Sequence, residues 1–193
     1  QKVDTADWHR LLQVVKNPEH TVEIAVSGKY IELHDAYKSI YESLNHAGIA
    51  HATKIRLRKV SAEAVYNDGA EKHLEGVHGI LVPGGFGERG FEGKIASIRY
   101  ARQQKIPFFG ICYGMQAAVV EFARNDLGIT DATTTEYDPK ANSPLIALME
   151  EQKRTNDKGG TMRLGAFACT LQSGTRSHQA YGELEISERH RHR

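Results

Sequence analysis

The feature that most constrains this chain is a cysteine between two glycines, in the run Gly-Ile-Cys-Tyr-Gly at positions 110–114. An apolar segment at 106–111 has the character of a short strand, and residues 115–124 have helical periodicity. A strand that turns into a helix through Gly-x-Cys-x-Gly is the thiol form of the nucleophile elbow. The glycines permit the sharp turn, and the helix N-terminus favours a thiolate. The pattern therefore predicts a nucleophilic cysteine that transfers acyl groups.

A second interpretation of a cysteine after an apolar strand is a small buried hydrophobic residue. This interpretation suits Cys169, but for Cys112 it leaves the two flanking glycines unexplained. Two cysteines so far apart do not indicate a disulfide scaffold, and they favour a reduced, cytoplasmic setting. The pair His190 and His192 lacks a third ligand at a suitable spacing, so no metal site is predicted.

Apolar segments alternate between strand-like and helix-like periodicity through the first two thirds of the chain. Strands are expected at residues 21–26, 54–60, 79–82, 106–111 and 164–171, and helices at 7–16, 35–48, 62–74, 93–103 and 115–124, with Asp35 capping and Gly48 closing the second helix. This alternation predicts an α/β fold with a doubly wound, mostly parallel sheet flanked by helices. Ligands bind beyond the carboxyl ends of such strands, where both Cys112 and the loop that begins at Pro83 are expected.

Bulk composition excludes several classes of function. The chain has 193 residues, of which 40% are hydrophobic, and this suits one sizeable α/β domain. A net charge of +1 supplies no field that would select nucleic acid or a membrane surface. No apolar run is long enough to span a bilayer. We therefore expect neither a nucleic-acid nor a membrane partner.

Five ordered segments resemble one known family. They are Val-Ser-Gly-Lys-Tyr-Ile-Glu-Leu at 26–33, Asp-Ala-Tyr-Lys-Ser at 35–39, Leu-Val-Pro-Gly-Gly-Phe-Gly-Glu-Arg-Gly-Phe-Glu-Gly-Lys at 81–94, Gly-Gly-Thr-Met-Arg-Leu-Gly at 159–165 and Glu-Arg-His-Arg-His-Arg at 188–193, and the elbow at 110–114 accompanies them. The chain resembles the C-terminal, class I glutamine amidotransferase domain of CTP synthases. The resemblance implies an interdomain linker at 1–18 and an amidotransferase domain at 19–193.

The resemblance also implies a role for each matching residue. Cys112 would attack the side-chain amide of L-glutamine, form a thioester and release ammonia. The implied oxyanion hole uses Gly85 and Tyr113, substrate binding uses Gly85, Gln116, Glu136 and Arg193, and Arg89 is a possible effector-lid contact. The residues by themselves leave other interpretations open, namely an ordinary loop at 83–85, a solvated acid at Glu136 and an exposed basic tail at 189–193.

Two departures from the family pattern affect the expected activity. The family's triad His and Glu lie in a Phe-His-Pro-Glu-Phe motif that this sequence lacks, and no histidine here has that context, so we expect the chain alone to be nearly inactive. The family usually has leucine where this chain has Tyr113, whose backbone N–H is nevertheless unchanged. A catalytically inactive binding or regulatory module, or another class I amidotransferase subunit, remains the alternative.

The resemblance implies partners and cofactors beyond this chain. An N-terminal synthase domain would use ATP and Mg²⁺ to convert UTP to CTP, with GTP as an allosteric activator. The full-length enzyme is expected to be a homotetramer. No cofactor is expected in the amidotransferase domain itself.

Overall fold

The computed structural model describes residues 4–147 and 163–192. The chain divides into two compact units, residues 1–146 and 147–193. The described part of the first unit holds the central sheet and the predicted elbow, and that of the second holds a small hairpin.

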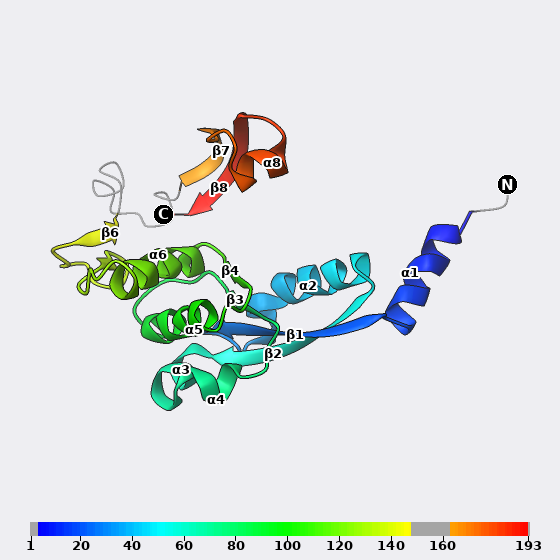
Figure 1. Cartoon of the computed structure of the whole chain (residues 1–193), viewed down its shortest axis with the longest axis horizontal. Coiled ribbons are helices and arrows are strands. Elements are labelled where there is room, and N and C mark those ends of the chain that lie inside the picture. The colour runs from blue at the N-terminus through cyan, green and yellow to red at the C-terminus, as the bar shows by residue number, and fades with distance from the viewer. Residues whose placement is uncertain (1–3, 148–162, 193) are drawn as a thin grey trace. The chain divides into compact units, whose positions relative to one another are not determined.

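A four-stranded parallel sheet forms the centre of the first unit (Figure 1). Its strands are β1 (His20–Gly28), β2 (Thr53–Ser61), β3 (Gly79–Val82) and β4 (Phe108–Gly110). They lie in the order β2-β1-β3-β4, and every neighbouring pair is parallel. The predicted doubly wound parallel sheet is confirmed, and its strand order switches direction between β1 and β3, the point beyond whose carboxyl ends such sheets bind ligands.

Helices cover both faces of this sheet. They are the 3-10 helix η1 (His34–Tyr37), α2 (Lys38–Ala50), α3 (Ala62–Asp68), α4 (Ala70–Leu74), α5 (Phe91–Gln103) and α6 (Tyr113–Asn125). A further helix, α1 (Ala6–Lys16), precedes β1 and buries none of its residues. Figure 1 shows α2 on one side of β1 and β2, and α3 and α4 on the other. Successive residues of β1 serve the two faces, because Ala25 packs with the α3–α6 cluster and Val26 with the α2 cluster.

The helices approach one another and the sheet closely at two glycines. A Cβ on Gly93 of α5 would overlap the backbone carbonyl of Ala62, where α3 begins. A Cβ on Gly114, in the first turn of α6, would overlap the carbonyl oxygen of Val82 in β3. Only glycine permits these approaches, so both positions fix how deeply α5 and α6 sit in the core.

Three local predictions need correction. Asp35 does not cap α2, because it lies inside η1, and the N-cap position belongs to Tyr37, which makes no side-chain cap bond. Gly48 does not close α2 but lies buried within it, where a Cβ would come 2.5 Å from the carbonyl oxygen of Thr53. The helix expected at 62–74 is two helices, since Gly69 interrupts it with a φ of +96°.

Two smaller strand pairs complete the described chain. In the first unit, β5 (Thr133–Thr134) pairs in parallel with β6 (Pro144–Ile146). In the second, β7 (Arg163–Thr170) pairs antiparallel with β8 (Glu185–His192), and α8 (Arg176–Tyr181) lies between them in sequence. The strand predicted at 164–171 is confirmed, and the backbone of residues 189–192 belongs to β8.

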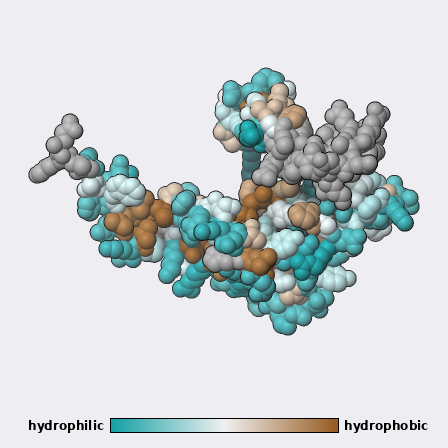
Figure 2. Space-filling view, turned by 180° about the vertical axis from the view of Figure 1, so that it is seen from behind, coloured by the Kyte–Doolittle hydropathy of each residue, from teal (hydrophilic) through white to brown (hydrophobic). Residues whose placement is uncertain are grey.

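The N-terminal helix α1 has an apolar stripe without a partner in its own unit. Trp8, Leu11, Leu12 and Val15 are exposed there, and Trp8 has 68% of its surface open. Figure 2 shows the stripe as a brown patch near the N-terminal end. Within the described ranges, no helix is long and apolar enough to cross a membrane.

Replacing Gly93 with alanine tests the close approach of α3 and α5. We expect a loss of unfolding free energy of about 3 kcal/mol, since the added Cβ meets rigid backbone. Gly128→Ala is the control, because Gly128 has open space around it but a φ of +74°, and the left-handed backbone alone should cost about 1 kcal/mol. Urea unfolding would measure both variants. Equal losses would show that the α3–α5 approach does not require glycine.

Candidate active site

The predicted elbow is present at the junction of β4 and α6. Cys112 is exposed and has φ of 52° and ψ of −108°. A residue other than glycine adopts this backbone conformation only at a cost in free energy. A Cβ on Gly110 would lie 2.8 Å from the backbone of Gly114 and Met115, so this turn requires a glycine. The strained backbone presents the sulfur in front of the N-terminus of α6, as a nucleophile elbow does.

The loop that follows β3 lies against the elbow. A Cβ on Gly84 would sit 3.4 Å from the Cβ of Cys112 and 4.0 Å from its Sγ. A Cβ on Gly85 would instead lie 3.2 Å from the Nζ of Lys94. The two glycines therefore bring bare backbone between the sulfur and a buried ammonium group.

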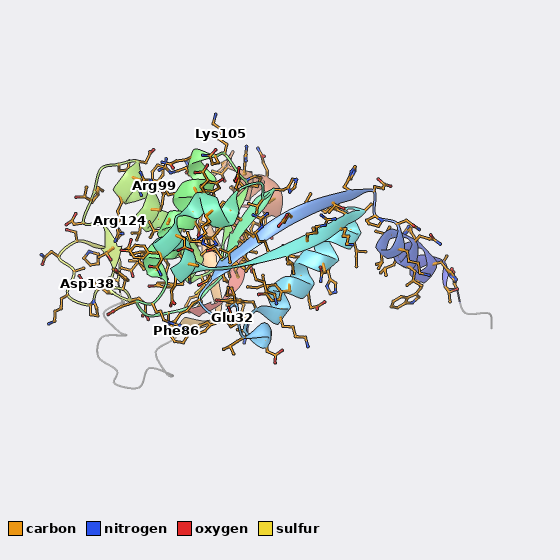
Figure 3. The ribbon with its side chains drawn as sticks, turned by 90° about the horizontal axis from the view of Figure 1, so that it is seen from below. Glu32, Phe86, Arg99, Lys105, Arg124 and Asp138 are labelled. Atoms are coloured by element: carbon orange, nitrogen blue, oxygen red, sulfur yellow. The ribbon has the colours of Figure 1, made fainter. Side chains whose placement is uncertain are left out.

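Side chains from four separate segments hold the backbone of this loop, residues 83–87, which we call the oxyanion loop after the role that the sequence predicts for Gly85. The contacts are Lys94 Nζ donating to the Pro83 carbonyl at 3.3 Å, Lys29 Nζ to the Phe86 carbonyl at 3.3 Å, the Tyr113 hydroxyl to the Gly87 carbonyl at 3.1 Å, and the Gly87 N–H to Glu136 Oε1 at 2.9 Å. Figure 3 shows Phe86 at the edge of the ribbon, with Lys105 on the opposite side of the view. The loop is thus fixed by contacts that are independent of any ligand.

Lys94 is the most unusual of these four side chains. It lies on α5 with 1% of its surface exposed, and its ammonium sits 4.8 Å from the centroid of the Tyr113 ring. Burial, and then the positive charge of Lys29, lower the pKa of Lys94, Cys112 opposes the shift, and the resulting pKa is about 8. A cation is therefore retained in the core directly behind the oxyanion loop.

The Tyr113 side chain links the elbow to the aromatic core. Its ring packs on Phe91 at a centroid distance of 5.2 Å, and Phe91 stacks on Tyr137 at 4.7 Å. Burial first, and then the charge of Glu136, raises the pKa of the Tyr113 hydroxyl. The hydroxyl therefore stays protonated and donates to the Gly87 carbonyl, a bond that a leucine could not make.

The other predicted site residues are distributed around the same end of the sheet. Glu136 is half-buried and its carboxylate accepts the Gly87 N–H. Gln116 lies in the first turn of α6, where its N–H donates to the Cys112 carbonyl at 3.1 Å. Arg89 pairs with Glu63 at 3.3 Å and lies over the Tyr30 ring. Arg193 is outside the described residues.

Sequence reasoning missed two contributors, namely Lys29 and Lys94. A signal for Lys94 was available, because position 94 falls on the buried stripe of α5 with Phe91, Ile95 and Ile98. A lysine on such a stripe is rarely fully buried without a specific reason. Lys29 had no comparable signal, since its contact depends on how separate loops meet.

Metal binding finds no support in the described part of the chain. There, no group of three or more His, Cys, Asp or Glu side chains is arranged to hold an ion. The side chains of His190 and His192 lie outside that part. The site is therefore described by its thiol, its backbone amides and its buried charge.

A strained cysteine elbow beside a glycine loop, at the carboxyl end of a doubly wound sheet, is the arrangement of a thiol-dependent acyl-transfer enzyme. Residues 32–193 match the family described as glutamine amidotransferase class-I. The chain belongs to this family.

Its relatives within the family are CTP synthases. The chain is 52% identical to the CTP synthase of Caldanaerobacter subterraneus over 190 residues and 52% identical to that of Clostridium acetobutylicum over 193 residues. These alignments cover 98% and 100% of the chain but 35% and 36% of the relatives. The chain therefore spans about a third of the length of the curated relatives it matches.

A solved structure gives the same result. The glutaminase domain of Trypanosoma brucei CTPS with bound acivicin matches with a TM-score of 0.77 and 36% identity. The match covers 89% of this chain and 67% of that one. The class I amidotransferase fold predicted from the sequence is confirmed.

Lys94→Met tests the buried charge through the pH dependence of stability. The pKa of Lys94 is about 8 in the folded chain, whereas the ordinary pKa of a lysine is 10.5. The unfolded chain therefore holds this proton to higher pH. The destabilising charge is fully present below pH 8 and is relieved as the pH rises toward 10.5. The stability of the parent relative to Lys94→Met should therefore increase across that window, by at most about 3 kcal/mol.

Urea unfolding of both chains at several pH values measures this difference. Groups that titrate in both chains cancel when the variant is subtracted from the parent. A difference that stays constant between pH 7 and pH 10 would contradict a depressed pKa at Lys94.

Proposed function

We propose that this chain is a glutaminase that hydrolyses L-glutamine through a thioester on Cys112 and supplies ammonia to a CTP synthase reaction. The observation that carries the proposal is the exposed Cys112 in a strained elbow, packed against the bare backbone of Gly84. An exposed thiol in front of a helix N-terminus is suited to nucleophilic attack rather than to packing.

The chemistry uses groups whose positions are described above. The Cys112 sulfur would attack the side-chain amide carbon of glutamine and place negative charge on the amide oxygen. The N–H groups of Tyr113 and Gly85 would donate to that oxyanion. The C–N bond then breaks as the amide nitrogen takes up the proton of the thiol and leaves as ammonia. Water then hydrolyses the thioester to glutamate and free thiol.

Proton transfer needs a general base that the described residues do not bring to the sulfur. Among the histidines whose side chains the structure describes, none forms a hydrogen bond with Cys112. His78 instead accepts the Glu23 N–H at 3.1 Å, and His178 accepts the Gly174 N–H at 3.3 Å. We therefore expect the chain by itself to release ammonia slowly, since loss of a general base costs about 10²–10⁴ in rate.

Glu136 can serve both the loop and the substrate. Its Oε1 accepts the Gly87 N–H, and an ionised carboxylate has further lone pairs on Oε2. That second oxygen is free to receive the α-ammonium group of glutamine, and Arg193 would receive the α-carboxylate. Gln116, in the first turn of α6, would complete the substrate contacts.

The activity of a whole CTP synthase extends this proposal beyond the chain. An N-terminal synthase domain would consume the ammonia, with ATP, Mg²⁺ and UTP as its ligands and GTP as activator. The exposed stripe of α1 and the Arg89 face are the surfaces we assign to contact with that domain and its effector. A cytoplasmic homotetramer is the assembly we expect.

The thiol assignment is tested by labelling with acivicin, which is bound in the solved CTPS relative. Both cysteines are exposed, but only Cys112 lies in an elbow at the N-terminus of a helix. We therefore expect Cys112 to be modified much faster than Cys169. Peptide mass mapping after a brief exposure measures both sites in one sample. Faster modification of Cys169, or no modification of Cys112, would leave a binding module as the better description.

Substrate binding is tested with Glu136→Ala and Arg193→Ala in a Cys112→Ser background, by calorimetric titration with glutamine. Each substitution removes a charge-assisted contact worth about 1.5–3 kcal/mol, so affinity should fall about 10- to 100-fold. Asp138→Ala, which removes an exposed neighbouring charge, is the matched control. Unchanged affinity in both test variants would mean that the substrate site lies elsewhere.

A further inference from the structure

Lys94 has no role in the proposed chemistry, although it lies directly behind the oxyanion loop. We propose that Lys94 is a positioning residue whose buried ammonium stabilises the Cys112 thiolate and the oxyanion across the Gly84–Gly85 backbone. The proposal rests on the proposed function only for its effect on turnover, because the effect on the thiolate can be measured without it.

No carboxylate in the described part of the chain forms an ion pair with Lys94. Its ammonium has three donors, yet the one hydrogen bond it makes is to the Pro83 carbonyl at 3.3 Å. Among the residues that the structure describes, Lys94 forms no ion pair, whereas the adjacent Glu92 on α5 is paired with Arg124 at 2.9 Å. A cation that is 1% exposed and lacks a counter-ion carries a large desolvation cost. An anion that forms nearby during the reaction would offset that cost.

Lys94 is faced by groups from the segment after β1 and from the elbow. Lys29, beyond the end of β1, repels it, and the Tyr113 ring offers its face at 4.8 Å. Cys112, from the elbow, favours the charged form of Lys94, as do the ring face of Tyr113 and the Pro83 carbonyl. Attraction between opposite charges is mutual, so a charged Lys94 favours the charged form of Cys112 in turn.

The backbone of Gly84 and Gly85 closely approaches both Cys112 and Lys94. A Cβ on Gly84 would face the sulfur at 4.0 Å, and a Cβ on Gly85 would face the Lys94 Nζ at 3.2 Å. The Gly84 backbone thus faces the sulfur, and the neighbouring Gly85 backbone faces the ammonium. Lys94 acts through this backbone, by holding the Pro83 carbonyl and by supplying positive charge from a buried position.

The test compares iodoacetamide alkylation of Cys112 with pH in the parent chain and in Lys94→Met, which keeps the length and bulk of the side chain. The pH at which the alkylation rate is half its plateau should rise by about one unit in the variant, since a neighbouring cation is lost. At pH values below both midpoints, the variant should be alkylated about tenfold more slowly than the parent, because a midpoint raised by one unit lowers the thiolate population about tenfold. Cys169 is the internal reference, and its profile should not move.

Lys105→Met is the matched control, because Lys105 is exposed and lies away from the oxyanion loop (Figure 3). It removes the same charge and should leave the Cys112 profile unchanged. A Lys94→Met chain that melts as a folded protein but shows the parent profile would overturn the proposal, because a purely structural lysine would not move this midpoint in either direction. An equal shift in Lys105→Met would also overturn it, since the effect would then be one of net charge.

A reciprocal measurement keeps the proposal testable if Lys94→Met does not fold. The titration of Lys94 can be followed by NMR of lysine carrying ¹³C at Cε, in the parent and in Cys112→Ser. Removing the thiolate should lower the Lys94 midpoint, and an unchanged midpoint would contradict the coupling. Neither readout requires glutamine turnover, so a chain without glutaminase activity could still confirm the role of Lys94, and an active chain could refute it.

Discussion

The contact on which the site depends is the approach of the first turn of α6 to β3. Gly114 has no space for a Cβ against the Val82 carbonyl, so α6 begins directly behind the end of that strand. The Ile111 N–H also donates to the Val82 carbonyl at 3.0 Å, which brings the chain from β4 to the same point. Between these two fixed contacts only Cys112 and Tyr113 remain, and Cys112 adopts a positive φ to connect them. The exposure of the sulfur is therefore a consequence of how tightly the helix packs on the sheet.

The oxyanion loop is rigid for a different reason. Loops are usually stabilised by a few contacts at their ends, whereas here side chains from four segments bind the backbone of residues 83–87. Donors that are already aimed need little rearrangement when charge develops on a substrate, and this preorganisation is a major source of catalytic power. Lys94 and the Tyr113 hydroxyl also tie the loop to α5 and to the elbow. Movement of either element would consequently displace the backbone of residues 83–87.

The parts of this architecture that depend on local periodicity were predictable from the sequence. The apolar strand at 79–82 and the helix after Cys112 follow from patterns that one segment carries by itself. The boundaries that were wrong depend on tertiary packing. Gly48 resembles a helix end, yet it stays helical because Thr53 approaches its backbone. Asp35 resembles a cap, yet the chain forms a 3-10 turn before α2 begins.

The site was predictable only in part for the same physical reason. Cys112 and the glycine pair form short motifs whose chemistry can be inferred from residue type and spacing. The contacts of Lys29 and Glu136 with the oxyanion loop join residues 57 and 49 positions apart, and no local pattern encodes them. Tyr113 is intermediate, because its backbone role follows from the elbow whereas its hydroxyl contact requires the structure.

The site also concentrates unfavourable terms that the rest of the unit must offset. A strained residue costs about 1–3 kcal/mol, and a buried lysine without a counter-ion adds a further penalty. Both terms fall at the carboxyl end of the sheet, whereas the buried apolar residues of the α3–α6 cluster supply the surface burial that favours folding. Stability and reactivity thus occupy different layers of the same unit. Glycines at the close contacts connect the two layers, since they set the depth at which α5 and α6 sit and hence the positions of Lys94 and Cys112.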